Sequence, residues 1–464
     1  GPAAIYGYVW DFGTGNESVG HRRWILDPEA LTMGTGSTDS SNALWVFGAT
    51  TPRPASPEFI AWPPAGNAPV PLVFPRWSFA PNTSSADVSA ATVTMTQNGT
   101  PISLTILPFS SGAADDTIVW EPDLEVDFGM TDTTVNVTVG NLVVDGSTTS
   151  YSYEVTIVDP FLTPVILGGT AAVSENTKAL VDNAASGVAV RIAGADRYDT
   201  AARIAQEFDP GVQAVFIATA FDFPDALAGG PAAASLESPI LLVGGGIPTA
   251  TRAELDRLNP GKIYILGGTG VISGTIAKDL QAYVSTPDEV IRLSGTDRWG
   301  TAAAVSAAMF SPGVPVAYVG TGLDFPDALA GGAAAASEGG PMLLTAPDDL
   351  PLATLNELKR LKPQKIVVIG GSAAVSDAVF DQLVPLSAGA VVRYSGADRY
   401  TTAADVSASV IEGPIHRLYI AVGTNFPDAL AGVPLAAREG ASILLVDTDL
   451  APDATLIEVA RLDW

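Results

Sequence analysis

The chain has no cysteine and only two histidines, His21 and His416. The absence of cysteine excludes disulfide scaffolds, thiolate zinc sites and a cysteine nucleophile. Positive charge is also scarce: 23 lysines and arginines stand against 50 aspartates and glutamates, a formal net charge of −27. This acidity opposes binding to a polyanion, so we expect no nucleic-acid partner. Apolar runs are too short to cross a bilayer, which needs about 18 residues, so no membrane span is expected.

The remaining composition is that of a folded protein. Hydrophobic residues make up 47% and charged residues 16% of the 464 positions, and this length predicts three to five folded units. No signal-peptide pattern opens the sequence, and Gly1-Pro2 is typical of a processing scar or the start of a fragment.

Two sequence blocks recur three times in phase. The first is Arg-x-x-Gly-x-Asp-Arg followed by an aromatic residue; its copies begin at Arg191, Arg292 and Arg393, each 101 residues after the last. The second is Phe-Pro-Asp-Ala-Leu-Ala-Gly, which begins at Phe223, Phe325 and Phe426. Chance does not produce two blocks in phase, so the chain contains tandem repeats.

A third block, an aliphatic run followed by Gly-Gly, sets the limits of the repeats. It occurs at 166–169, 265–268 and 368–371, which predicts units at 163–262, 263–364 and 365–464. A fourth copy would come next where the sequence stops. The strand at 165–167 then either completes a sheet of the last unit, closing the units into a ring, or the array is simply cut at that point.

The repeats are predicted to be α/β. Runs 215–218, 240–243 and 263–266 are continuously apolar, as in strands covered on both faces of a parallel sheet, and they alternate with alanine-rich helical stretches. Helices are expected to start after Asp196, Asp297 and Asp398 and at each Phe-Pro-Asp, where the preceding Asp222, Asp324 or Asn425 is interpreted as the cap. Asp225, Asp327 and Asp428 there lie in a first turn and are interpreted as structural residues at the junctions.

The N-terminal third differs from the repeats. Alternating polar and apolar residues at 93–96, 135–139 and 151–157 predict half-buried antiparallel strands, so residues 60–162 are expected to form a β-sandwich of Ig-like size. Residues 1–59 lack a clear helix period and are too few to form a core alone.

Candidate binding residues come from the first block. Arg197, Arg298 and Arg399 are each followed by an aromatic residue, namely Tyr198, Trp299 and Tyr400. An arginine can hold a phosphate or carboxylate and a ring can stack on a sugar, so the pairs suit an acidic glycan, with repetition supplying avidity. The alternative is that each arginine bonds carbonyls of a neighbouring unit while the ring fills the interface between units.

Other chemistry is poorly supported. The Gly-Gly turns match neither a dinucleotide nor a P-loop motif, so no cofactor is expected. His21 lies beside two arginines with no second histidine nearby, so neither a catalyst nor a metal site is predicted there. His416 precedes a strand and is interpreted as structural. The acids are too numerous for a catalytic carboxylate pair to be selected.

The three phased blocks resemble the cell wall binding repeat family over about residues 165–464. The resemblance implies three Rossmann-like modules in a compact pseudo-threefold arrangement, a monomer that holds a secreted protein noncovalently on an anionic wall polymer of Gram-positive bacteria. It favours the polymer-binding interpretation of the arginines. Pro239 and Pro341, in Pro-Ile/Met-Leu-Leu, match a family motif tied to module association and ligand binding; Ser442 replaces the third proline.

The first 50 residues resemble the end of a bacterial CAP-superfamily domain. The resemblance rests on Ser18-Val19-Gly20-His21-Arg22, on 25–28 and on 33–36, and it aligns His21 with a cavity histidine of that superfamily. We therefore expect a noncatalytic secreted surface protein: a CAP remnant at 1–59, a β-sandwich spacer at 60–162 and a three-unit wall anchor. Two alternatives remain, a cell-wall hydrolase or other N-terminal effector targeted by the repeats, and an adhesin acting through the β-sandwich.

Overall fold

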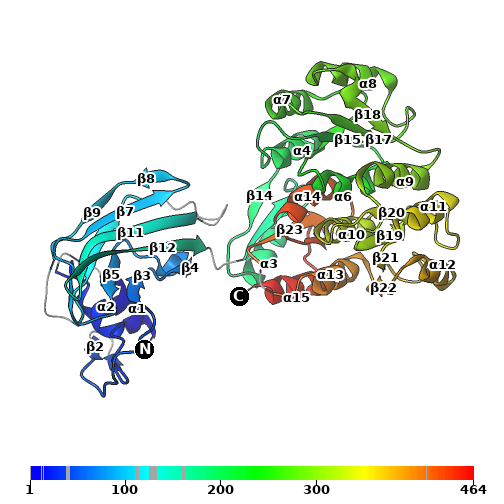
Figure 1. Ribbon diagram of the computed structural model, residues 1–464. Helices are drawn as coiled ribbons and strands as arrows, with labels where there is room; N and C mark the ends of the chain where they lie inside the picture. The colour runs from blue at the N-terminus through cyan, green and yellow to red at the C-terminus, as the bar shows by residue number, and fades with distance from the viewer. Residues whose placement is uncertain are drawn as a thin grey trace. The chain divides into compact units, whose positions relative to one another are not determined.

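The computed structural model describes residues 2–463 except 12, 14, 38–41, 110–113, 125–132, 159–161, 223 and 414. The chain divides into two compact units, Gly1–Pro160 and Phe161–Trp464, which are described separately below (Figure 1). Over the described ranges, none of the helices is both long enough and apolar enough to cross a membrane.

Two short helices and a hairpin open the N-terminal unit. These are α1 (Pro2–Trp10), α2 (Gly20–Ile25), β1 (Gly34–Ser37) and β2 (Asn42–Trp45). The sequence did not reveal the helices, because six to nine residues are too few to display a helical period. Arg22 anchors α2. Its guanidinium is buried and donates to the carbonyls of Val9, Trp10 and Arg76.

Two sheets form the rest of this unit. One has the order β3-β5-β10-β9 and is antiparallel; the other has the order β4-β12-β11-β7-β8, with β6 beside β11 and a parallel pair β4–β12. Rings from the first sheet, Trp77, Phe79 and Trp120, share one core with the alternate valines of β11. The strands and one 3-10 turn are β3 (Phe59–Trp62), β4 (Gly66–Pro69), η1 (Val70–Leu72), β5 (Trp77–Pro81), β6 (Ala86–Asp87), β7 (Thr92–Gln97), β8 (Thr100–Ile102), β9 (Leu104–Ile106), β10 (Ile118–Pro122), β11 (Thr133–Val144) and β12 (Ser147–Val158).

The alternating segments predicted at 93–96, 135–139 and 151–157 are confirmed as β7, β11 and β12. The predicted boundary between 59 and 60 falls inside β3, and Arg22 donates to the carbonyl of Arg76, just before β5, and to the hydroxyl of Ser78 in β5. Residues 1–59 therefore share a folded unit with the sheets that follow them.

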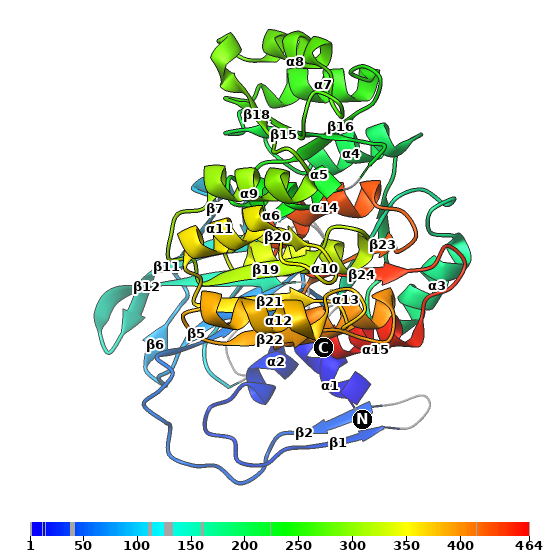
Figure 2. The ribbon, with the colours of Figure 1, turned by 90° about the vertical axis from the view of Figure 1, so that its right-hand side faces the viewer.

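Three four-stranded parallel sheets build the C-terminal unit, as the continuously apolar runs predicted (Figures 1 and 2). Their orders are β14-β13-β23-β24, β16-β15-β17-β18 and β20-β19-β21-β22. The strands are β13 (Thr163–Leu167), β14 (Val190–Ile192), β15 (Val215–Thr219), β16 (Ile240–Val243), β17 (Ile263–Leu266), β18 (Val290–Leu293), β19 (Val316–Thr321), β20 (Met342–Thr345), β21 (Lys365–Ile369), β22 (Val391–Tyr394), β23 (Arg417–Val422) and β24 (Ile443–Val446).

Each sheet joins strands from two sequence units. The unit boundaries predicted at 262/263 and 364/365 lie between neighbouring strands of one sheet, because β15 pairs with β17 and β19 pairs with β21. The third sheet joins the two ends of the array: β13 pairs in parallel with β23, from Thr163 opposite Arg417 to Leu167 opposite Ala421. Each sheet thus contains the last two strands of one sequence unit and the first two strands of another.

Helices cover the sheets and meet in the middle of the unit, where α6, α10 and α14 contact one another (Figure 1). Small residues permit this approach: a Cβ on Gly230 would lie 2.6 Å from Val433. The helices are α3 (Glu175–Ala184), α4 (Arg197–Ala205), α5 (Pro224–Leu227), α6 (Gly229–Ala234), α7 (Thr249–Leu258), α8 (Gly274–Leu280), α9 (Arg298–Met309), α10 (Pro326–Ser337), α11 (Leu352–Leu361), α12 (Asp377–Leu383), α13 (Arg399–Val410), α14 (Pro427–Arg438) and α15 (Asp453–Leu462), with 3-10 turns η2 (Gln281–Tyr283), η3 (Pro287–Glu289) and η4 (Val384–Leu386).

Helix starts follow the sequence closely. Asp196, Asp297 and Asp398 cap α4, α9 and α13 by accepting backbone N–H groups of the first turn, as predicted. Pro326 and Pro427 occupy the first turns of α10 and α14, also as predicted. The predicted capping by Asp324 and Asn425 is displaced by one residue. Phe325 and Phe426 are the cap residues, and the preceding side chains accept their N–H groups.

Candidate functional site

The candidate site lies where the carboxyl ends of β15 and β17 meet. In the sheet order β16-β15-β17-β18, β16 is added on one side of β15 and β18 on the opposite side of β17. The order in which successive strands are added therefore reverses between β15 and β17. The crevice outside such a switch point is the usual ligand position in open α/β sheets, because the two following loops part there. A hollow of about 240 Å³ occupies this crevice.

The hollow has walls from two sequence units. Thr219 ends β15, and Asp222 and Asp225 follow it, whereas Asp297 and Arg298 are the cap and first residue of α9 in the next unit. Helix packing produces this arrangement, since α9 contacts α5 and α6. The same packing recurs for α13 against α10 and for α4 against α14. The unit therefore presents three equivalent sites, named below after Arg298, Arg399 and Arg197.

An aspartate forms the floor of each site. Asp225 lies against Gly267, Asp327 against Gly370 and Asp428 against Gly168, three glycines with φ near +100° at the first position of each Gly-Gly pair. A side chain there would both collide with the carboxylate and strain the backbone. The Gly-Gly blocks are thus explained by close approach of these aspartates.

Burial raises the pKa of Asp225 and of Asp327, while hydrogen bonding to Thr301 and to Thr402 opposes the rise. Burial raises the pKa of Asp428 to about 6, against the opposing charge of Arg197. The Oδ1 atom of Asp428 is buried and has no hydrogen-bond partner. Sequence reasoning missed the two threonines, although both stand at one repeated position in Thr-Ala-Ala.

Each candidate arginine bridges its own helix start and a neighbouring loop. Nη1 of Arg197 donates to the carbonyl of Ala220 at 2.6 Å, Nη1 of Arg298 to Gly322 at 2.5 Å and Nη1 of Arg399 to Gly423 at 2.6 Å. These carbonyls belong to the arginine's own sequence unit. All three side chains remain half-buried, and that of Arg399 is 34% exposed. One edge of each guanidinium is therefore used structurally while the group keeps contact with solvent.

The aromatic residues pack beside the arginines against glycines. A Cβ on Gly423 would lie 2.9 Å from the Tyr400 ring, one on Gly322 3.2 Å from Trp299 Nε1, and one on Gly244 2.5 Å from the Tyr198 hydroxyl. The rings are half-buried and partly packed on the central core. Trp299 Nε1 is buried without a partner. The rings contact the core as the interface-filling interpretation expects, but the arginines bond carbonyls of their own unit and not, as that interpretation held, of a neighbouring one.

Pro239 and Pro341 lie away from these sites. Each directly precedes a strand and accepts a backbone N–H, from Phe216 and Tyr318 respectively, at the amino ends of the sheets. Ser442 makes the same bond with Tyr419, so the third copy keeps the pairing without proline. The structure thus separates the two prolines from the site aspartates, which lie at the carboxyl ends.

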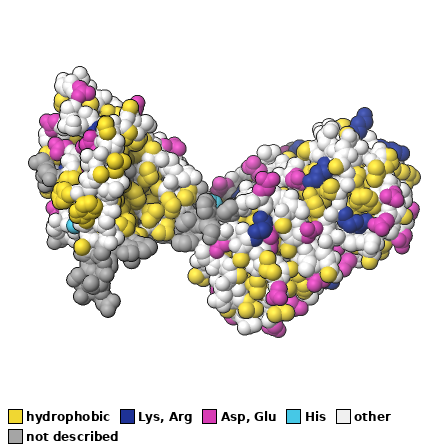
Figure 3. All heavy atoms as spheres, turned by 90° about the horizontal axis from the view of Figure 1, so that it is seen from below, with side chains coloured by type: hydrophobic (Ala, Val, Ile, Leu, Met, Phe, Trp, Pro, Cys, Tyr) yellow, Lys and Arg dark blue, Asp and Glu magenta, His cyan; other side chains and the backbone are white. Residues whose placement is uncertain are grey.

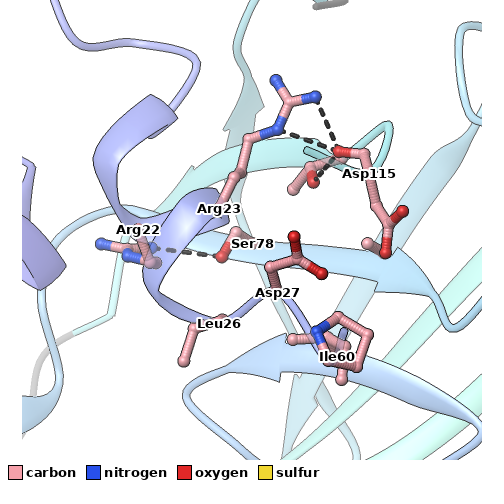
Figure 4. A pocket seen from close by; sticks show the side chains of 10 residues that line it. Arg22, Arg23, Leu26, Asp27, Ile60, Ser78 and Asp115 are labelled. Atoms are coloured by element: carbon pink, nitrogen blue, oxygen red, sulfur yellow. Dashed lines mark hydrogen bonds between the residues drawn. The ribbon is translucent and has the colours of Figure 1, made fainter. Parts of the chain in front are cut away.

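His21 belongs to the N-terminal unit. Its Nδ1 lies 2.7 Å from Oδ1 of Asp11, a buried residue that the sequence analysis did not select, and its ring is 5.1 Å from that of Tyr8. A small pocket nearby is lined by Arg22, Arg23 and Asp27, with Arg23 donating to the carbonyl of Asp115 (Figure 4). Burial lowers the pKa of Arg22 to about 10. The carbonyl of His416 accepts the N–H of Thr163.

Comparison with known proteins identifies the repeats. The profile of the family Cell wall binding domain 2 (CWB2) matches residues 191–277, 292–380 and 393–460. The amidase enhancer of Bacillus subtilis (strain 168) is 33% identical over 274 residues, which are 59% of this chain and 36% of that protein. The N-acetylmuramoyl-L-alanine amidase LytC of the same organism is 28% identical over 270 residues, 58% of this chain and 51% of that protein. The chain thus spans between a third and about half of these relatives.

Two solved structures share the fold. Cwp6 from Clostridium difficile superposes with a TM-score of 0.57 at 20% identity, covering 82% of this chain and 61% of that one. Cwp8 from Clostridium difficile gives 0.53 at 21% identity, covering 76% and 58%. The matched family ranges begin at Arg191, Arg292 and Arg393, the same block that carries the candidate arginines. With three matches that together cover just over half of its length, the chain belongs to the Cell wall binding domain 2 family.

Proposed function

We propose that the C-terminal unit anchors a secreted bacterial surface protein to an anionic cell-wall polymer, without catalysis. The observation that carries this proposal is the threefold recurrence of a half-exposed arginine and ring, which at the Arg298 site lies beside a switch-point crevice. A polymer with a repeating charge can engage several such sites at once, and avidity then gives firm but reversible attachment. The proposed contact residues are Arg197, Tyr198, Arg298, Trp299, Arg399 and Tyr400.

Local arginines can outweigh the overall negative charge in this role. Acidic side chains are scattered over the face seen in Figure 3, with fewer basic ones among them. At physiological salt, charges beyond about 8–10 Å are screened, so the arginine nearest the ligand dominates. A guanidinium that already donates one N–H to a carbonyl is also oriented in advance, which lowers the entropy lost on binding.

The proposal also covers the N-terminal unit and the cellular location of the protein. We propose that the two sheets form an Ig-like sandwich that acts as a spacer, that α1, α2 and the segment around His21 are a CAP-superfamily remnant, and that the sheets of the C-terminal unit are Rossmann-like. The cell wall or cell surface is the proposed location. The match to a cell wall binding family supports it.

Co-sedimentation with purified Gram-positive cell walls tests the anchor. Arg197→Ala, Arg298→Ala and Arg399→Ala combined should abolish sedimentation with walls that retain their acidic glycan, and wild-type protein should not sediment with walls stripped of it. The matched control replaces the exposed Arg203, Lys278 and Lys359 by alanine, which removes the same charge away from the sites. Equal binding by both triple variants would refute the proposal, provided that both melt as the wild type does.

A further inference from the structure

One of the positions at which the three sites differ in charge lies just before the site aspartate. The residue three places before the site aspartate is Asp222 at the Arg298 site and Asp324 at the Arg399 site, but Asn425 at the Arg197 site. All three side chains are exposed. The first two sites therefore hold three carboxylates around one guanidinium, for example Asp222, Asp225 and Asp297 around Arg298. At the Arg197 site Asp428 and Asp196 remain, and Asp199, in the first turn of α4, accepts the N–H of Ala195 and lies 3.4 Å from Nε of Arg203.

Contacts show what the extra carboxylate does. At the Arg399 site, Nη2 of Arg399 lies 3.8 Å from Oδ2 of Asp324, so an internal anion already faces the guanidinium. The electrostatic surroundings agree: Asp324 and Asp398 both act on Asp327, and Asp222 and Asp297 both act on Asp225. Arg197 is the charged group that acts on Asp428. An incoming anion thus meets less repulsion at Arg197.

Asn425 also offers a donor in place of an acceptor. Its Oδ1 accepts the N–H of Phe426, which leaves the Nδ2 amide group as the other polar end of the side chain. An amide N–H can donate to a phosphate or carboxylate oxygen, whereas the aspartates at the equivalent position can only accept when ionised. The same substitution therefore removes a repulsion and adds a possible hydrogen bond.

The floor of the Arg197 site has unused bonding capacity as well. Asp225 and Asp327 interact with Thr301 and Thr402, but Oδ1 of Asp428 is buried without a partner. An unsatisfied buried acceptor costs free energy that a ligand hydroxyl can recover. A sugar that carries a hydroxyl near its anionic group would supply both interactions.

We propose that the Arg197 site, formed by Arg197, Tyr198, Asp428 and Asn425, is the principal anion site of the three, and that Asn425 is the residue that selects it. This inference rests on the proposed wall-anchoring function. The Arg298 and Arg399 sites then contribute weaker, supporting contacts along the same polymer.

Single substitutions test the inference in co-sedimentation with purified walls bearing their acidic glycan. Arg197→Ala should weaken binding about tenfold or more, and Arg298→Ala or Arg399→Ala less than about threefold, which are magnitudes expected for losing a direct or a supporting charged contact. Asn425→Asp should weaken binding about tenfold, and the reciprocal Asp324→Asn should strengthen it. Because aspartate occupies this exposed position in the other two sites, Asn425→Asp is compatible with the fold.

The outcomes distinguish the ranking of the three sites from the proposed anchoring function. Equal losses from the three single arginine variants, or unchanged binding by Asn425→Asp, would overturn the ranking of sites while leaving the anchor intact. Unchanged binding by the triple arginine variant would overturn the proposed function itself. Melting curves for each variant establish that lost sedimentation reflects the site and not unfolding.

Discussion

Replacing Asp428 by asparagine should stabilise the C-terminal unit at neutral pH and leave it unchanged in acid. Burial raises the pKa of this carboxyl from 3.8 to about 6. The folded state therefore binds an extra proton between those values. The stabilisation from the protonated carboxyl is complete below about pH 4 and is lost as the pH rises through about 6.

The magnitude follows from the shift. About two pKa units correspond to about 3 kcal/mol as an upper limit, since one unit is worth about 1.4 kcal/mol. Asparagine has nearly the same shape as aspartate and carries no charge, so the variant should avoid this cost above pH 6. For a unit of this size, 3 kcal/mol raises the melting temperature by about 5 °C.

Calorimetry of the wild type and Asp428→Asn at pH 3.5 and pH 7.5 measures the effect. Taking the difference between the two proteins at each pH cancels the titration of the remaining acids. Asp324→Asn is the control, because that carboxylate is 60% exposed and should give little difference at either pH. A stability difference that is the same at both pH values, or a variant less stable at pH 7.5, would refute the reasoning.

Three further predictions address binding, stability and activity. Raising NaCl from about 0.05 to 0.5 M should weaken wall binding at least fivefold if arginine contacts to an anion dominate, and sedimentation that is unchanged would indicate stacking and neutral hydrogen bonds instead. Arg22→Met should destabilise the N-terminal unit by about 3 kcal/mol, seen in its urea unfolding, because three backbone carbonyls lose their buried donor; a change below about 1 kcal/mol would contradict the anchoring role of Arg22. Incubation with purified peptidoglycan should release no soluble fragments, and turnover would favour the hydrolase alternative.

Local patterns predicted much of the fold. The continuous apolar runs at 215–218, 240–243 and 263–266 became buried parallel strands, because such runs suit a sheet covered on both faces. The capping aspartates 196, 297 and 398 could also be predicted from the sequence, since capping depends on residues within one turn. Helices α1 and α2 could not be predicted, because their stability comes from contacts such as those of Arg22 with distant carbonyls.

The candidate site could be predicted only in part, because it is assembled across units. Arg298 and Asp225 are 73 positions apart in the printed sequence, and nothing local indicates that α9 packs against α5 and α6. The sequence did place Asp222, Asp324 and Asn425 at one position, but the position was interpreted as a helix cap. Only the juxtaposition of Asp324 with Arg399 shows that this residue faces the neighbouring unit's guanidinium. A substitution that is nearly neutral for capping, aspartate to asparagine, thereby changes the charge of a site built by another repeat. In tandem repeats where each unit supplies part of its neighbour's site, single substitutions can change the charge of that site without altering the fold.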